Sequence, residues 1–141
     1  MDANNSFFEA CEEGDLEKAK LLIEKGTNIE AKDNDGNNPL IYASCYGRIE
    51  IVKYLIEKGA DIEAKGNYGY TPLIVASCYG YIEVVKYLVE IGTDTNHKNN
   101  NEKTFYYYLN ENQKKEIDLI IEDIEERKRM IKPCSFLATR T

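Results

Sequence analysis

Side chains able to act as general acids, nucleophiles or metal ligands are scarce in this chain. Its 141 residues include one histidine, His97, and no orienting carboxylate stands at a readable spacing from His97 or from Ser77. The sequence also lacks the nucleophile elbow of serine hydrolases and any phosphate-binding glycine loop. We therefore expect no catalytic residue, and we expect that the protein is not an enzyme.

The cysteines predict neither a metal site nor a disulfide framework. They are Cys11, Cys45, Cys78 and Cys134. No Cys-x-x-Cys pair occurs, and one histidine cannot complete a Cys/His zinc set. Cys45 and Cys78 would stand on packed helices about 8–10 Å apart, whereas a disulfide needs Cα atoms within about 7 Å. We expect reduced thiols and no cofactor.

One acidic segment, Asp33-Asn34-Asp35-Gly36, resembles the start of a calcium-binding loop. The first ligand position of such a loop would fall on Ala31. The twelfth would fall on Tyr42, where a bidentate glutamate is needed. The segment therefore predicts a hairpin turn and no metal site.

The charge balance narrows the classes of partner. The chain carries 18 Lys and Arg against 25 Asp and Glu, a net charge of −7. Such a surface repels phosphate backbones and anionic membranes, and no apolar run approaches the roughly 20 residues of a membrane span. We expect a monomer in the cytoplasm, with the nucleus and a host cell left open. Its partners would include neither nucleic acid nor membrane.

The elements that carry these residues repeat along the chain. Residues 35–67 and 68–100 are identical at 20 of 33 positions. The spacing of 33 continues upstream, because Gly14 precedes Gly47 and Gly80 at the same interval. A fixed period of this size predicts a solenoid, in which each unit buries its apolar face against its neighbours.

Each unit predicts two helices and a hairpin. Pro39 suits the first turn of a short helix through residues 40–46, and Gly47 suits the tight turn that ends it. A second helix starts near Ile49, with Val52 and Leu55 on its apolar face. An extended segment and a turn at residues 66–69 complete the unit.

These repeats resemble ankyrin repeats. The family pattern Gly-x-Thr-Pro-Leu-His-x-Ala appears as Gly69–Ala76, and Gly80–Leu88 matches the later Gly-x-Ile-Glu-Val-Val-Lys-x-Leu pattern. Ile41 and Ile74 replace the family histidine, and Asn38 replaces the threonine. The resemblance implies an all-α fold, an α-solenoid of about four stacked helix–turn–helix–hairpin repeats.

The expected domain covers residues 1–132. Its repeats span about 4–34, 35–67, 68–100 and 101–132, and the outer two act as caps. In the last repeat we expect a longer helix from about Lys114. Pro133 would end that helix, leaving residues 133–141 as a loose tail.

The resemblance also implies a protein partner bound on the concave face, formed by the hairpins and the short helices. Positions that differ between the two regular repeats, and several tyrosines beside them, are the candidates for contact. They are Asp35, Asn37, Tyr42, Tyr46, Arg48, Tyr68, Tyr70, Tyr79, Tyr81, Asn99 and Asn101. The alternative for these tyrosines is that some rings cover the junction between helix and hairpin.

The acidic hairpins favour a partner with a basic or mixed-charge surface. A regulatory or inhibitory subunit, docking on an enzyme or assembly, would use the same surface as a simple binding module. Asn96 resembles the asparagine that is hydroxylated in some ankyrin repeats, which makes it a candidate modification site.

Overall fold

The computed structural model describes the backbone of residues 3–140 and the side chains of residues 3–131. Within that range every regular element is a helix. The chain divides into two compact units, one ending at Leu109 and one beginning at Asn110. The first contains the repeats, and the second consists of one long helix with its N-terminal cap.

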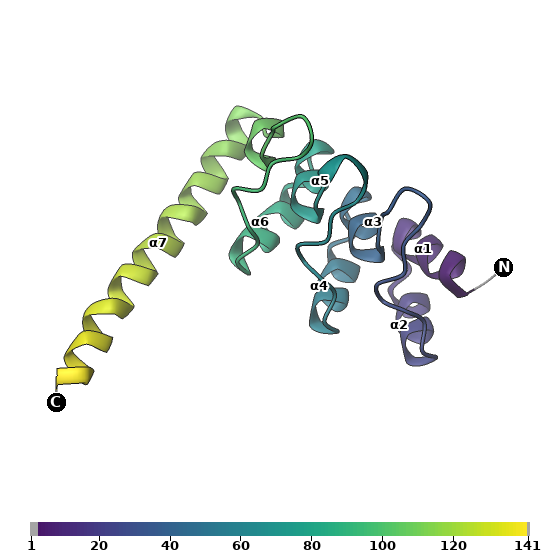
Figure 1. Cartoon of the computed structure of the whole chain (residues 1–141), viewed down its shortest axis with the longest axis horizontal. Coiled ribbons are helices and arrows are strands. Elements are labelled where there is room, and N and C mark those ends of the chain that lie inside the picture. Colours follow the sequence, from purple (N-terminus) through teal and green to yellow (C-terminus); the bar gives the residue numbers. More distant parts are fainter. Residues whose placement is uncertain (1–2, 141) are drawn as a thin grey trace. The chain divides into compact units, whose positions relative to one another are not determined.

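The repeats fold as three helix pairs. The pairs are α1 (Ala3–Glu13) with α2 (Leu16–Glu24), α3 (Pro39–Cys45) with α4 (Ile49–Glu57), and α5 (Pro72–Cys78) with α6 (Ile82–Glu90). Helices α1, α3 and α5 pack side by side in one row, and α2, α4 and α6 form the second row (Figure 1). This arrangement is the predicted all-α solenoid.

The start and end of each short helix follow from local chemistry. Pro39 and Pro72 occupy the first turn, where a missing N–H costs nothing. The Asn38 side chain accepts a hydrogen bond from the Ile41 N–H at 2.8 Å, so the asparagine replaces threonine as the cap. Gly47 then adopts a φ of +70°, which allows the tight turn into α4.

The core of the repeats lies between the two rows of helices. Leu40 and Leu73 of the short helices are fully buried, as are Val52 and Leu55 of α4. These positions recur at helical spacing, so each apolar stripe faces the neighbouring helices. The predicted register of the second helices is therefore confirmed.

Three turns, here called fingers, project beside the short helices. They are finger 1 (residues 33–37), finger 2 (66–70) and finger 3 (99–103), each closed by a hydrogen bond between its end residues. The backbone of one finger bonds to the next, from Asn67 N to Asp35 O at 3.1 Å and from Asn100 N to Tyr68 O at 2.8 Å. Consecutive repeats are thus joined in register.

Two glutamates make a second set of links between repeats. Glu30 Oε1 accepts a hydrogen bond from the Asp61 N–H at 2.9 Å, and Glu63 Oε1 accepts one from the Asp94 N–H at 3.1 Å. The two bonds are equivalent, because donors and acceptors both lie 33 residues apart. Each junction between repeats therefore has the same polar connection.

The fourth repeat departs from the pattern, as its sequence predicts. The 3₁₀ helix η2 (Phe105–Tyr108) takes the place of a short α-helix and packs on α5. Phe105 is buried, whereas Tyr107 is 59% exposed. Without proline at its start and glycine at its end, the segment does not form a full helix–turn–helix unit.

The long helix α7 spans Glu111–Arg140 and begins three residues before the predicted start. Asn110 and Gln113 cap it reciprocally, each side-chain oxygen accepting from the other residue's N–H. The prediction that Pro133 ends the helix is wrong, because the helix continues through it. Proline removes one backbone donor, and a long helix can continue past that loss. The separate tail at 133–141 stays a prediction, and Thr141 lies outside the described residues.

Candidate binding groove

A hollow of about 470 Å³ opens between the fingers and the short helices α3 and α5. We call it the tyrosine groove, because five of its lining residues are tyrosines. It is lined by Asp35, Asn37, Ile41, Tyr42, Cys45, Tyr46, Asn67, Tyr68, Tyr70, Val75 and Tyr79. Its volume falls in the range of typical ligand sites.

The structure brings together most of the residues predicted for partner contact. Those that line the tyrosine groove are Asp35, Asn37, Tyr42, Tyr46, Tyr68, Tyr70 and Tyr79. They come from fingers 1 and 2, from helix α3 and from the residues that directly follow α3 and α5. The repeat architecture thus brings residues from a stretch of 45 residues of sequence onto one continuous surface.

The floor of the groove is apolar. Ile41 and Val75 are buried with Ala64, and Cys45 and Tyr70 pack against them. Val75 holds the position equivalent to Tyr42, so the smaller side chain leaves room at that point of the row. The sequence contained two signals for this floor, the isoleucine in place of the family histidine and the Tyr-to-Val difference between repeats.

One wall is built on α3. The Tyr42 hydroxyl donates to Asp33 Oδ2 at 2.8 Å, and the Tyr42 ring lies 4.8 Å from the Phe8 ring. Burial raises the pKa of Tyr42, and the Asp33 carboxylate raises it further. Tyr46 stacks on Tyr42 at 6.4 Å, and burial together with the Glu12 carboxylate raises the pKa of Tyr46. This wall is fixed by its own contacts.

The opposite wall is built on finger 2 and α5. The hydroxyls of Tyr70 and Tyr108 lie 3.5 Å apart, and Asn99 Nδ2 donates to Tyr108 at 2.8 Å. The hydrogen bond with Tyr108 raises the pKa of Tyr70 to about 12. The neighbouring Cys45 and burial raise the pKa of Tyr79, which is nevertheless 63% exposed. Tyr79 therefore presents a largely free ring at the rim.

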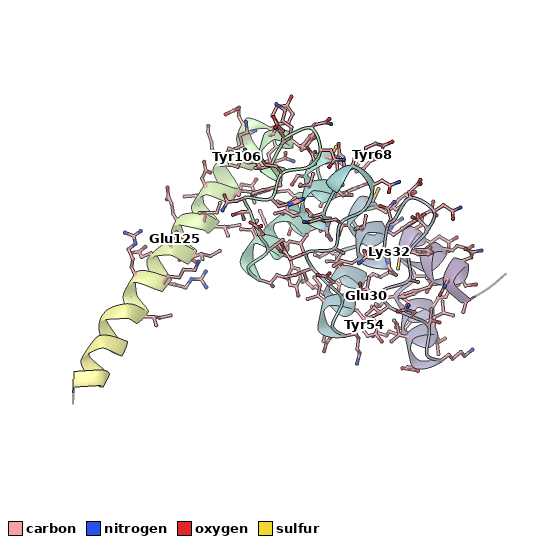
Figure 2. All side chains as sticks on the ribbon, viewed as in Figure 1. Glu30, Lys32, Tyr54, Tyr68, Tyr106 and Glu125 are labelled. Carbon is pink, nitrogen blue, oxygen red and sulfur yellow. The ribbon has the colours of Figure 1, made fainter. Side chains whose placement is uncertain are left out.

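Tyr68, at the tip of finger 2, has the most unusual backbone of the groove. Its φ is +63°, a left-handed conformation that bulky residues rarely adopt. The side chain is 71% exposed, so no core contact explains why a tyrosine stands there. In Figure 2, Tyr68 lies at the upper edge of the repeats, whereas Tyr54 of α4 lies at the lower edge. The finger thus holds an aromatic ring in solvent beside the groove.

Comparison with known proteins accounts for this architecture. A family model of ankyrin repeats, in three copies, matches residues 7–99, more than half of the chain. The chain belongs to the ankyrin-repeat family. Ankyrin repeats are generally protein-binding modules and typically non-catalytic. A search of curated proteins found no match to the chain. The family match ends before the fourth repeat at 101–132, which stays a prediction.

Four of the predicted contact residues lie outside the groove of this ankyrin-repeat stack. Arg48 Nε donates to the Glu12 carbonyl at 2.9 Å, and Arg48 lies against Gly14. Tyr81 holds the equivalent position one repeat later, and its ring lies against Gly47. These two side chains cover the turn of the preceding repeat. A comparison of two repeat sequences does not reveal this packing role.

Asn99 is corrected to a structural residue. It is only 4% exposed, and its Oδ1 accepts hydrogen bonds from the N–H groups of Asn101 and Lys103. With Nδ2 bound to Tyr108, the whole amide is used to hold finger 3. Asn101 is exposed on the same finger, and Asn96 is exposed in the preceding turn. Hydroxylation of Asn96 stays a prediction.

The remaining chemistry-bearing side chains serve the ankyrin fold. His97 Nε2 lies 3.0 Å from the Gly69 carbonyl oxygen, and Ser77 Oγ donates to the Leu73 carbonyl at 2.8 Å. Asp33 Oδ1 accepts from two N–H groups of its own finger, as the predicted turn requires. Cys45 and Cys78 are free thiols. No helix in the described part of the chain is long and apolar enough to cross a bilayer.

Proposed function

We propose that this protein binds a protein partner in the tyrosine groove and acts as a non-enzymatic interaction module. The carrying observation is that seven of the predicted contact residues surround one groove, and five of them, Asp35, Asn37, Tyr42, Tyr68 and Tyr70, stand at positions that differ between the two regular repeats. Exposed tyrosines supply large contact area with little loss of side-chain entropy, which suits a recognition surface.

The charge of the chain favours a partner with a basic or mixed-charge surface. The net charge is −7, and Asp35 stands at the edge of the groove. Complementary charge speeds association and excludes acidic competitors. We therefore propose partners with exposed lysines or arginines at their contact surface.

Affinity capture from the native cell with the full chain tests the proposal. The test variant combines Tyr68→Ala with Tyr79→Ala, since both rings are more than half exposed. The variant should lose a specifically captured protein while its melting temperature stays within about 3 °C of wild type. Tyr70 is left intact, because it packs against the groove floor.

Tyr107→Ala is the matched control. Its ring is 59% exposed and lies outside the groove, so capture should be unchanged. Equal capture by all three proteins would contradict the proposal. An activity assay of the captured protein then separates a simple binding module from an inhibitory subunit.

A further inference from the structure

We propose that the tyrosine groove is a subsite for a guanidinium group, and that the partner inserts an arginine side chain into it. The inference deepens the proposed function and rests on it. Five tyrosines and one carboxylate line the groove, and its lining includes no lysine or arginine. Tyrosine faces attract cations, and a nearby carboxylate adds directed hydrogen bonds.

Tyrosines elsewhere in the chain already make cation–π contacts. Lys20 and Lys58 each lie 5.7 Å from the centre of the Tyr54 ring, and Lys53 lies 5.5 Å from that of Tyr87. At η2, the ammonium group of Lys103 lies 4.3 Å from the centre of the Tyr107 ring. Three of the tyrosines outside the groove, Tyr54, Tyr87 and Tyr107, are therefore paired with the chain's own lysines.

The groove tyrosines lack such a cation. Among the side chains that the structure describes, no ammonium or guanidinium group lies over Tyr42, Tyr46, Tyr68, Tyr70 or Tyr79. Tyr68 and Tyr79 are 71% and 63% exposed, so a ligand can reach their faces. A cation from the partner would make, in the groove, the same cation–π contact that the chain's own lysines make elsewhere.

The carboxylates near the groove have distinct roles. Asp33 uses both oxygens within the protein, accepting from two backbone N–H groups and from the Tyr42 hydroxyl. Asp35 is exposed and lines the groove, and its carboxylate has no hydrogen-bond partner among the described residues. The Asp35 carboxylate is therefore the group that can accept hydrogen bonds from the N–H groups of an incoming guanidinium.

The shape and polarity of the groove favour arginine over lysine. A guanidinium is planar and weakly hydrated, so it stacks on rings while its edge donates several hydrogen bonds. An ammonium holds its water more strongly and offers no flat face. The apolar floor of Ile41 and Val75 suits the methylenes of an arginine.

Peptide titration of the full chain, followed by NMR, tests the subsite. The probe is the acetylated, amidated peptide Gly-Ser-Arg-Ser-Gly, compared with the same peptide carrying citrulline or lysine. Citrulline keeps the planar shape of arginine and removes its charge. The arginine peptide should bind about tenfold more tightly than the citrulline peptide, with shifts at the amides of Ile41, Tyr42 and Val75.

Two carboxamide variants locate the charge contact. Asp35→Asn should weaken binding of the arginine peptide by about tenfold and leave citrulline binding unchanged. Glu90→Gln removes the same charge from an exposed site on α6 and should change neither. Equal affinity for arginine and citrulline, shifts confined to other surfaces, or equal losses in both variants would overturn the subsite. Tighter binding of the lysine peptide than of the arginine peptide would overturn it too.

The two proposals fail in different ways. If Tyr68→Ala with Tyr79→Ala abolishes partner capture while arginine and citrulline peptides bind equally, the partner site stands and the guanidinium subsite is wrong. If the groove selects arginine but partner capture is unaffected by those variants, the groove binds a guanidinium group, whereas the proposed partner site and the insertion of the partner's arginine are both wrong.

Discussion

Glu102 stands at a position that glycine holds in the two preceding fingers. Gly36 and Gly69 have φ values of +76° and +74°, and Glu102 is forced to +61° at the equivalent place. A residue with a Cβ adopts that conformation at a cost of about 1 kcal/mol. Glu102→Gly should therefore stabilise the protein by about 0.5–1 kcal/mol, measured by urea denaturation.

The control for Glu102 is Glu102→Ala. Alanine removes the charged side chain and keeps the Cβ, so it should give none of the gain. Loss of stability in the glycine variant would show that the Glu102 side chain, rather than its backbone, determines the energetics of finger 3.

Tyr70 makes the free energy of unfolding depend on pH in the alkaline range. Its pKa is raised from the ordinary 10 to about 12 in the folded protein, because the hydrogen bond with Tyr108 favours the neutral phenol. This stabilisation is complete below pH 10, and it is lost as pH rises from about 10 to about 12, where the unfolded phenol ionises first. Denaturation curves of wild type should lose stability more steeply over this range than those of Tyr70→Phe. Parallel losses would assign the alkaline transition to other groups.

At the scale of the helix, the second helices stabilise the repeats through their buried faces. Leu55 of α4 is 0% exposed. Leu55→Ala should lower the free energy of unfolding by about 2–5 kcal/mol, because it leaves a cavity between neighbouring helices. Leu21→Ala, at a leucine that is 55% exposed, should change it by less than about 0.5 kcal/mol. A nearly neutral Leu55→Ala would contradict the packing register.

The elements could be predicted from the sequence because each has a local cause. Pro39 and Gly47 bound α3 by their own backbone preferences, and the spacing of Val52 and Leu55 defines the face of α4. Seven of the eleven predicted contact residues line one groove for a related reason, since a solenoid places equivalent positions in rows.

What the sequence did not reveal concerns contacts that no local pattern encodes. Asn99 holds finger 3 through bonds to Tyr108 and to the finger backbone, which a one-letter difference from Gly66 does not reveal. Arg48 covers a turn of the preceding repeat, and the partner atoms lie 36 residues away in sequence. Proline disfavours the interior of a helix but does not exclude it, and α7 continues through Pro133.

At the scale of the whole molecule, the charge of −7 affects how fast a partner arrives. A basic partner would be steered by the field of the chain, and salt screens that field within about 10 Å at 0.1 M. Raising salt from about 50 to about 500 mM should slow association with the captured partner by about tenfold or more, with a much smaller change in dissociation. Surface plasmon resonance measures both rates. An association rate independent of salt would contradict a basic partner surface.

The equivalent links from Glu30 to Asp61 and from Glu63 to Asp94 have a consequence for synthesis on the ribosome. Each acceptor precedes its donor by 31 residues. A folded repeat therefore already presents the glutamate carboxylate that accepts a hydrogen bond from the repeat synthesised next. Repeats contact only their neighbours, and a nascent solenoid can therefore grow by addition to an ordered edge. Folding of this chain should keep pace with translation, with each new repeat using the last as its template.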